Sequence, residues 1–133
     1  MAHERILIVE DNALNAKLLR DVLHVEGYRT VEAGSAEDGL ALAWADPPAL
    51  VLMDVHLPGM DGVQALDRLR ADARTRYVPV IAVTASAMPL ERAEIVGAGF
   101  DGCLVKPLDV DQMLDEVRAV LDRAEIEAQE RAR

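Results

Sequence analysis

A single acidic residue, Asp54, ends an unbroken apolar run at residues 49–53 (ALVLM). A run this short, rich in branched residues and preceded by two prolines, predicts a strand buried on both faces. Turn-forming residues follow at positions 58–62 (PGMDG). Because ligands bind at the carboxyl ends of strands in open parallel sheets, we expect Asp54 to stand at a binding edge.

The same pattern recurs along the chain, where other short apolar runs end at residues able to do chemistry. These residues are Glu10, Asp11, Thr84 and Lys106. Three carboxylates raise one another's proton affinity unless a cation lies between them. Oxygen ligands without clustered imidazoles or thiolates favour a hard ion, and an open site favours Mg²⁺. A phosphoryl group could then contact the metal, Lys106 and Thr84, with Asp54 as the nucleophile and an acyl phosphate as the product.

Segments with apolar residues at helical spacing separate the apolar runs. We predict strands at residues 5–9, 29–33, 49–54, 78–84 and 103–105, and helices at 13–26, 36–46, 62–71, 89–96 and from 110 onward. Asn12, Ser35 and Asp109 are expected to cap helices, and Gly27 to end the first one. Strands that alternate with helices through short connections predict an α/β fold, with a five-stranded parallel sheet covered on both faces.

Taken together, these motifs resemble the receiver domain of response regulators, the CheY-like family of two-component signalling. The motifs are Glu10-Asp11, LMDVHLPGMDG around Asp54, VIAVTASA around Thr84, and Lys106-Pro107. The resemblance implies a doubly wound, flavodoxin-like (βα)5 sheet with strand order 2-1-3-4-5. It assigns residues 1–123 to the receiver and leaves 124–133 as a helical extension or frayed tail. The segment EDNALNAKLL is also similar to single-domain regulators of the DivK type and to receivers attached to hybrid kinases.

The resemblance implies roles for the acidic residues. Asp54 would accept a phosphoryl group from a phosphohistidine on a histidine kinase or a histidine phosphotransfer protein. Asp11, Asp54 and the backbone carbonyl of His56 would bind Mg²⁺ directly, and Glu10 would act through a water molecule. The output would be a changed face, formed by the fourth helix, fifth strand and fifth helix, that binds a downstream protein.

The resemblance also implies roles for the residues around the phosphoryl group. At one position, however, this chain differs from the pattern common in the family. Thr84 would hydrogen-bond a phosphoryl oxygen and move toward it on activation, Lys106 would pair with the phosphoryl group, and the Lys106–Pro107 peptide bond would be cis. Many receivers carry Tyr or Phe three residues before the lysine, whereas this chain carries Cys103. The usual switch pairs the movement of the threonine with that of the aromatic ring. Without that ring, the output face would change through backbone shifts or through Phe100, and we favour a packing role for Phe100.

Composition narrows the functional classes. The chain of 133 residues suits one domain. A net charge of −10 leaves no basic excess for nucleic acid or an anionic membrane, and no apolar run has the length of a membrane span or the features of a signal peptide. One cysteine cannot form an internal disulfide, which predicts a reducing cytoplasm. A monomer and a weak dimer both fit this composition.

Three other functions compete with a phosphorylation-controlled binding module that has no external substrate. An aspartyl-nucleophile phosphatase of the haloacid-dehalogenase kind needs a second acid two residues after the nucleophile, where this chain has His56. A flavin-binding protein needs a Ser/Thr/Gly-rich phosphate loop, where this chain has residues 10–13 (EDNA). A receiver-like module that binds without phosphorylation is disfavoured because all the site residues are present. Only a short tail follows the last helix, so we expect no DNA-binding domain.

Overall fold

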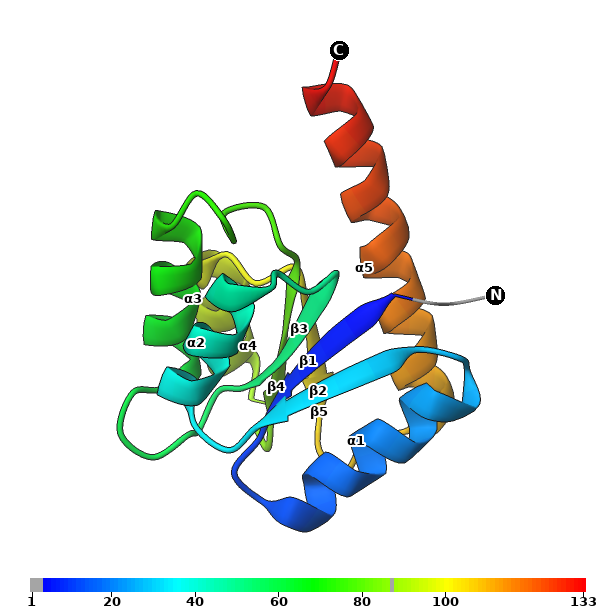
Figure 1. The fold of residues 1–133 in the computed structure, drawn as a ribbon. Coiled ribbons are helices and arrows are strands. Elements are labelled where there is room, and N and C mark those ends of the chain that lie inside the picture. Colours follow the sequence, from blue (N-terminus) through cyan, green and yellow to red (C-terminus); the bar gives the residue numbers. More distant parts are fainter. Residues whose placement is uncertain (1–3, 87) are drawn as a thin grey trace.

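The computed structural model describes residues 4–86 and 88–133; residues 1–3 and Ala87, the last residue of the VIAVTASA motif, lie outside this description. Within it, strands and helices alternate (Figure 1). The strands are β1 (Arg5–Val9), β2 (Arg29–Ala33), β3 (Leu50–Asp54), β4 (Val80–Thr84) and β5 (Gly102–Val105). The helices are α1 (Ala13–Val25), α2 (Ala36–Ala45), α3 (Gly62–Ala71), α4 (Pro89–Ala98) and α5 (Val110–Arg131).

The strands form one parallel sheet in the order β2-β1-β3-β4-β5. The predicted doubly wound, flavodoxin-like fold is therefore confirmed. The chain leaves β1 toward one edge of the sheet and leaves β3 toward the other. Connections that diverge in this way open a crevice at the carboxyl ends of β1 and β3, where such folds bind their ligands.

Each face of the sheet packs against its own set of helices (Figure 1). Val51 joins a hydrophobic cluster with α2, α3 and α4, in which Leu66 is fully buried. Leu52, the next residue, joins the opposite cluster with α1 and α5, in which Val117 is fully buried. Successive strand residues point to opposite faces, so an unbroken apolar run is needed to fill both clusters. Each such side chain contributes roughly 1.5–3 kcal/mol through burial.

The helix ends follow the predicted capping residues. The side chains of Asn12, Ser35 and Asp109 each accept a hydrogen bond from the backbone N–H three residues later. Gly27 has φ of 89°, the left-handed conformation expected after a helix. At the start of α3, Asp61 forms a reciprocal capping box, so this helix begins at a fixed point just after the β3 loop.

Strand β4 begins at Val80, two residues after the predicted start at Val78. Pro79 has no N–H to offer to a sheet. The N–H of Val80 donates to Asp101 Oδ2 at 2.8 Å, and Arg70 Nη2 donates to the same oxygen at 2.9 Å. The predicted start was wrong because these side chains, distant in sequence, supply the polar contacts there.

Helix α5 continues without a break through residue 123 to Arg131. Its last turns project beyond the end of the sheet where β1 begins (Figure 1). The Arg131 guanidinium lies over the Tyr77 ring, 3.9 Å from its centroid. Among the described residues no helix is both long and apolar enough to cross a bilayer.

Candidate functional site

Strand β3 carries Asp54 to the carboxyl edge of the sheet. All five residues of the strand are buried, and Asp54 itself is only 6% exposed. The backbone N–H of His56 donates to Asp54 Oδ1 at 2.9 Å. A Cβ atom at Gly62 would lie 2.8 Å from the Asp54 carbonyl oxygen, so the close approach of α3 requires glycine. The acid is therefore held in a fixed orientation at the rim of the core.

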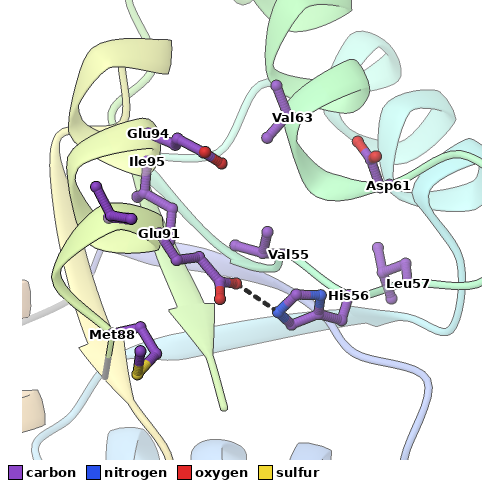
Figure 2. A pocket seen from close by; sticks show the side chains of 10 residues that line it. Val55, His56, Leu57, Asp61, Val63, Met88, Glu91, Glu94 and Ile95 are labelled. Atoms are coloured by element: carbon purple, nitrogen blue, oxygen red, sulfur yellow. Dashed lines mark ion pairs between the residues drawn. The ribbon is translucent and has the colours of Figure 1, made fainter. Parts of the chain in front are cut away.

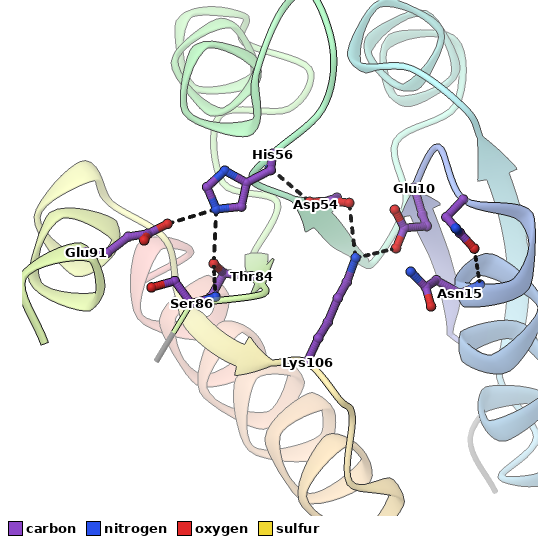
Figure 3. Close-up of polar contacts among 9 residues, drawn as sticks. Glu10, Asn15, Asp54, His56, Thr84, Ser86, Glu91 and Lys106 are labelled. Carbon is purple, nitrogen blue, oxygen red and sulfur yellow. Dashed lines mark hydrogen bonds and ion pairs between the residues drawn. The ribbon is translucent and has the colours of Figure 1, made fainter. Parts of the chain in front are cut away.

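Lys106, which follows β5, joins two acids that are distant in sequence (Figure 3). Its Nζ donates to Glu10 Oε1 at 2.8 Å and to Asp54 Oδ2 at 3.2 Å. The Lys106–Pro107 peptide bond is cis, as the family resemblance implied. Hydrogen bonds between ionised partners are stronger than neutral ones, and these connect the ends of β1, β3 and β5.

Three acids form a cluster that fits a divalent cation. Glu10, Asp11 and Asp54 each offer a carboxylate oxygen, and these oxygens lie within 4.8 Å of one another. Glu10 Oε2 is buried and has no hydrogen-bond partner within the described part of the chain, whereas Asp11 is exposed. An all-oxygen set that is open on one side suits Mg²⁺, and a cation would supply the partner that Glu10 Oε2 lacks.

The proton affinities of these groups differ in a way that favours an ionised Asp54. Burial raises the pKa of Glu10 to about 7, and contact with Asp54 adds to this effect. Burial also acts to raise the pKa of Asp54, but hydrogen bonds with Glu10, the His56 N–H and Lys106 lower it on balance. The two acids titrate as a pair in which Glu10 keeps the proton longer. Asp54 is thus the carboxylate available as a nucleophile.

The Thr84 hydroxyl belongs to a neighbouring group of polar side chains (Figure 3). Its Oγ1 accepts a hydrogen bond from the Ser86 N–H at 3.1 Å and lies 3.4 Å from His56 Nε2. His56 Nε2 lies 2.8 Å from Glu91 Oε1 in the first turn of α4. Hydrogen bonds from Ser86, together with contacts to His56 and Thr84, lower the pKa of Glu91.

An open groove of about 710 Å³ lies between α4 and the segment that joins β3 to α3 (Figure 2). Val55, Leu57 and Ile95 contribute apolar surface to it, and Glu94 contributes a carboxylate. The His56–Glu91 pair bridges the two walls of this groove. The first turn of α4 is therefore joined to the β3–α3 segment across an open space.

The structure brings together most, but not all, of the residues singled out in the sequence. Glu10, Asp11, Asp54 and Lys106 form one cluster. The Thr84 hydroxyl instead contacts His56, Ser86 and Glu91. The proposed metal role of the His56 carbonyl stays a prediction. Sequence reasoning missed Ser86 and Glu91. Their only signal is position, directly after the Thr84 strand, which does not reveal where their side chains point.

The two residues weighed as possible switch elements are both packing residues of the cluster formed with α2, α3 and α4. Phe100 is 8% exposed and belongs to that cluster, in agreement with the packing role favoured from the sequence. Cys103 is partly buried against the same cluster, and burial raises the pKa of its thiol. Neither side chain lies among the polar contacts of Thr84.

Fold and site define a doubly wound α/β protein with a carboxylate cluster at the edge where β1 and β3 end. The sequence from residue 6 to 118 matches the family model described as the response regulator receiver domain. The chain belongs to this family and is the receiver of a two-component response regulator.

Relatives and solved structures agree with that assignment. The chain is 38% identical over 119 residues to the polar-differentiation response regulator DivK of Brucella ovis, covering 90% of this chain and 97% of that protein. A CheY-like receiver from Methanospirillum hungatei JF-1 has a TM-score of 0.85 at 30% identity, covering 94% and 98% of the two chains. The receiver domain of a sensor histidine kinase from Pseudomonas aeruginosa PAO1, solved with magnesium coordinated in its active-site cleft, has a TM-score of 0.83 at 30% identity, covering 90% and 98%.

Proposed function

We propose that Asp54 is the phosphoacceptor of this receiver and that its phosphorylation controls the binding of a downstream protein. The observation that carries this proposal is the contact of Lys106 with both Asp54 and Glu10 at the buried end of the sheet. That arrangement supplies a carboxylate nucleophile and an ammonium group that is already partly desolvated. It resembles a site built to hold a dianionic phosphoryl group rather than a site built for stability alone.

The transfer uses groups of this chain at each step. An Asp54 carboxylate oxygen attacks the phosphorus of a phosphohistidine, the phosphorus–nitrogen bond breaks, and its electron pair stays on the imidazole nitrogen, which takes up a proton. Lys106 exchanges its carboxylate contact for a phosphoryl oxygen, and the Thr84 hydroxyl donates to another. Preorganised donors of this kind stabilise the charge that develops during transfer.

Glu10, Asp11, Asp54 and the His56 carbonyl would hold Mg²⁺, in keeping with the magnesium found in the cleft of the Pseudomonas receiver. When bound, the ion would neutralise charge on the phosphoryl oxygens. The chain's own contribution is to keep these oxygens within reach of one another in a partly buried setting. Autophosphorylation from small donors and autodephosphorylation would be the only reactions of the domain, which has no external substrate.

The expected partners are a cytoplasmic histidine kinase or histidine phosphotransfer protein and a downstream protein. Leu14 and Leu18 are exposed on α1, directly after the acidic pair, and offer apolar surface to the phosphohistidine donor. Leu90 and Val96 are exposed on α4, which supports an output face formed by α4, β5 and α5. We expect no direct contact with nucleic acid or membrane, and a monomer or weak dimer.

Intact mass spectrometry after incubation with acetyl phosphate and Mg²⁺ tests this function. We expect the wild-type chain to gain one phosphoryl group, and we expect no gain with EDTA or in Asp54→Asn. Asp122→Asn, an exposed acid at the other end of the sheet, is the matched control and should behave as wild type. An equal gain in Asp54→Asn would contradict the acceptor assignment, and turnover of a small phosphate ester would instead favour the phosphatase.

A further inference from the structure

The first turn of α4 has little packing to hold it in place. Ile95 is the only buried residue of α4, and it lies in the second half of the helix. Met88, at the N-cap, provides no side-chain cap, and both Met88 and Leu90 are exposed. Segments with few buried apolar contacts open at low cost in free energy. Contacts made by the first turn therefore have a large influence on where it lies.

Glu91 makes such a contact across the groove. Its carboxylate lies 2.8 Å from His56 Nε2, and the same imidazole nitrogen lies 3.4 Å from Thr84 Oγ1 (Figures 2 and 3). One ring nitrogen has a single position for a hydrogen bond, so the shorter contact to Glu91 dominates over the one to Thr84. The three side chains form a chain of contacts from the end of β4, through the β3–α3 segment, to α4.

His56 also joins this chain of contacts to the acceptor. Its backbone N–H donates to Asp54 Oδ1, while its side chain reaches Glu91. A change at Asp54 that moves this segment, or that draws the Thr84 hydroxyl away, alters the surroundings of the imidazole directly. The packing residues Phe100 and Cys103 offer no comparable polar connection between the site and α4.

We propose that the His56–Glu91 contact holds the first turn of α4 in the unphosphorylated arrangement and must break when Asp54 is phosphorylated. This inference rests on the proposed phosphoacceptor function. His56 and Glu91 are positioning residues: they hold Thr84 and α4, and they do not touch the reacting atoms through their side chains. Release of the contact frees the α4 turn that carries Leu90, which changes the face presented to a partner.

A contact that stabilises only the resting arrangement opposes any ligand that favours the other one. Removing it should therefore tighten binding of a phosphoryl mimic. Because Glu91 and His56 are partly exposed, with side-chain exposures of 29% and 56%, the effect should be about two- to fivefold in apparent affinity. A contact with a purely structural role would leave the affinity unchanged or weaken it.

The test measures the apparent Kd for beryllofluoride in the presence of Mg²⁺, followed by amide chemical shifts. Glu91→Gln should lower this Kd about two- to fivefold. Glu94→Gln, which changes the next acid along the groove, should leave it unchanged. In a His56→Asn background, Glu91→Gln should change this Kd less than it does in the wild type, because the contact with His56 is already absent and only the Ser86 and Thr84 contacts of Glu91 remain to be lost.

A second measurement reports the position of α4 without any ligand. Cys103 is the only cysteine of the chain, and it lies on β5, which α4 contacts. Release of α4 in Glu91→Gln should make Cys103 react faster with a thiol reagent than in wild type or Glu94→Gln.

The inference is overturned if Glu91→Gln binds beryllofluoride no more tightly than wild type, or if its effect adds fully to that of His56→Asn. It is overturned equally if Cys103 reactivity is the same in all variants. These outcomes leave Asp54-dependent binding by the wild-type chain intact. Loss of that binding would instead refute the proposed function, and this inference with it.

Discussion

Two groups of charged side chains, at opposite ends of the sheet, use the same residue types in different ways. At the carboxyl end, Lys106 contacts Glu10 and Asp54, whose side chains are 2% and 7% exposed. At the amino end, Arg118 contacts Glu4 and Asp122 at 3.0 Å each, with side-chain exposures of 32% and 59%. The two groups thus differ in burial more than in contact distance.

The difference lies in how completely the charges are matched. Arg118 also donates to the Tyr28 hydroxyl at 3.3 Å and lies between two acids that are more exposed than Glu10 and Asp54. At the carboxyl end, three acids lie close together and Lys106 contacts two of them, and Glu10 Oε2 is buried without a partner among the described residues. Buried charge that is not fully paired lowers stability. We infer that the carboxyl-end group is kept for binding and chemistry, and the amino-end group for joining α5 to the sheet.

The largest expected difference between the two ends concerns phosphorylation. Lys106→Ala should slow phosphoryl gain from acetyl phosphate by about 10²–10³-fold, because one preorganised cation is lost where negative charge develops. Arg118→Ala should react at the wild-type rate. Time courses of intact mass measure both, and an equal slowing of the two variants would show that loss of folding, not loss of chemistry, explains the result.

The next effect is the dependence of stability on pH. The pKa of Glu10 is raised from 4.5 to about 7 by burial, so the folded chain binds this proton more tightly than the unfolded chain. The resulting stabilisation is fully present below pH 4.5 and is lost as the pH rises through about 7. The lowered pKa of Asp54 affects stability only at pH values below this range.

Glu10→Gln should therefore remove this loss of stability with rising pH. In EDTA, the free energy of unfolding of the wild-type chain should fall by about 1–3 kcal/mol more than that of Glu10→Gln between acidic and mildly alkaline pH. Urea unfolding at several pH values measures it. If the free energy of unfolding changes with pH in the same way in the two proteins, Glu10 does not carry the raised pKa.

A smaller effect is expected at the amino end. Arg118→Ala should lower the free energy of unfolding by about 1 kcal/mol, through lost ion pairs and lost contact of its aliphatic stem. Because these pairs are partly exposed, high salt should reduce the difference between variant and wild type. Urea unfolding at low and high salt tests this. A salt-independent difference would mean that packing alone accounts for the effect.

The smallest effect should follow removal of residues 124–133. We propose that the receiver is complete at residue 123 and that the following turns of α5 are an extension. The extension's ring contact, Arg131 over Tyr77, suggests a loss of about 0.5 kcal/mol in unfolding free energy and no change in phosphorylation. Failure of the shortened chain to fold would place the extension within the domain.

The strand ends illustrate what the sequence can predict. A buried parallel strand needs an unbroken apolar run, so the residue that ends the run marks the carboxyl edge, and this rule locates Glu10, Asp54 and Lys106. The order of the strands and the cis peptide bond came from the family resemblance instead. The order has no local signal, because it depends on which strands pair across long separations.

The side-chain contacts beyond the strand ends could not be predicted. The His56–Glu91 contact joins a loop residue to the first turn of a helix, and no spacing rule states where either side chain points. The start of β4 was misjudged for a related reason, since Asp101 supplies the contact at Val80 from 21 residues away. For residues 124–133 the sequence left a helical extension and a frayed tail as alternatives, and the structure shows the helix, which no Gly or Pro interrupts.

The most direct test of the central claim is to locate the acyl phosphate itself. After phosphorylation with acetyl phosphate and Mg²⁺, borohydride reduces an aspartyl phosphate to homoserine, which peptide mass spectrometry can assign to a position. We predict homoserine at position 54 alone, and none when EDTA is present. Modification at Asp11, or at acids of the amino end such as Asp122, with position 54 unchanged, would contradict the account.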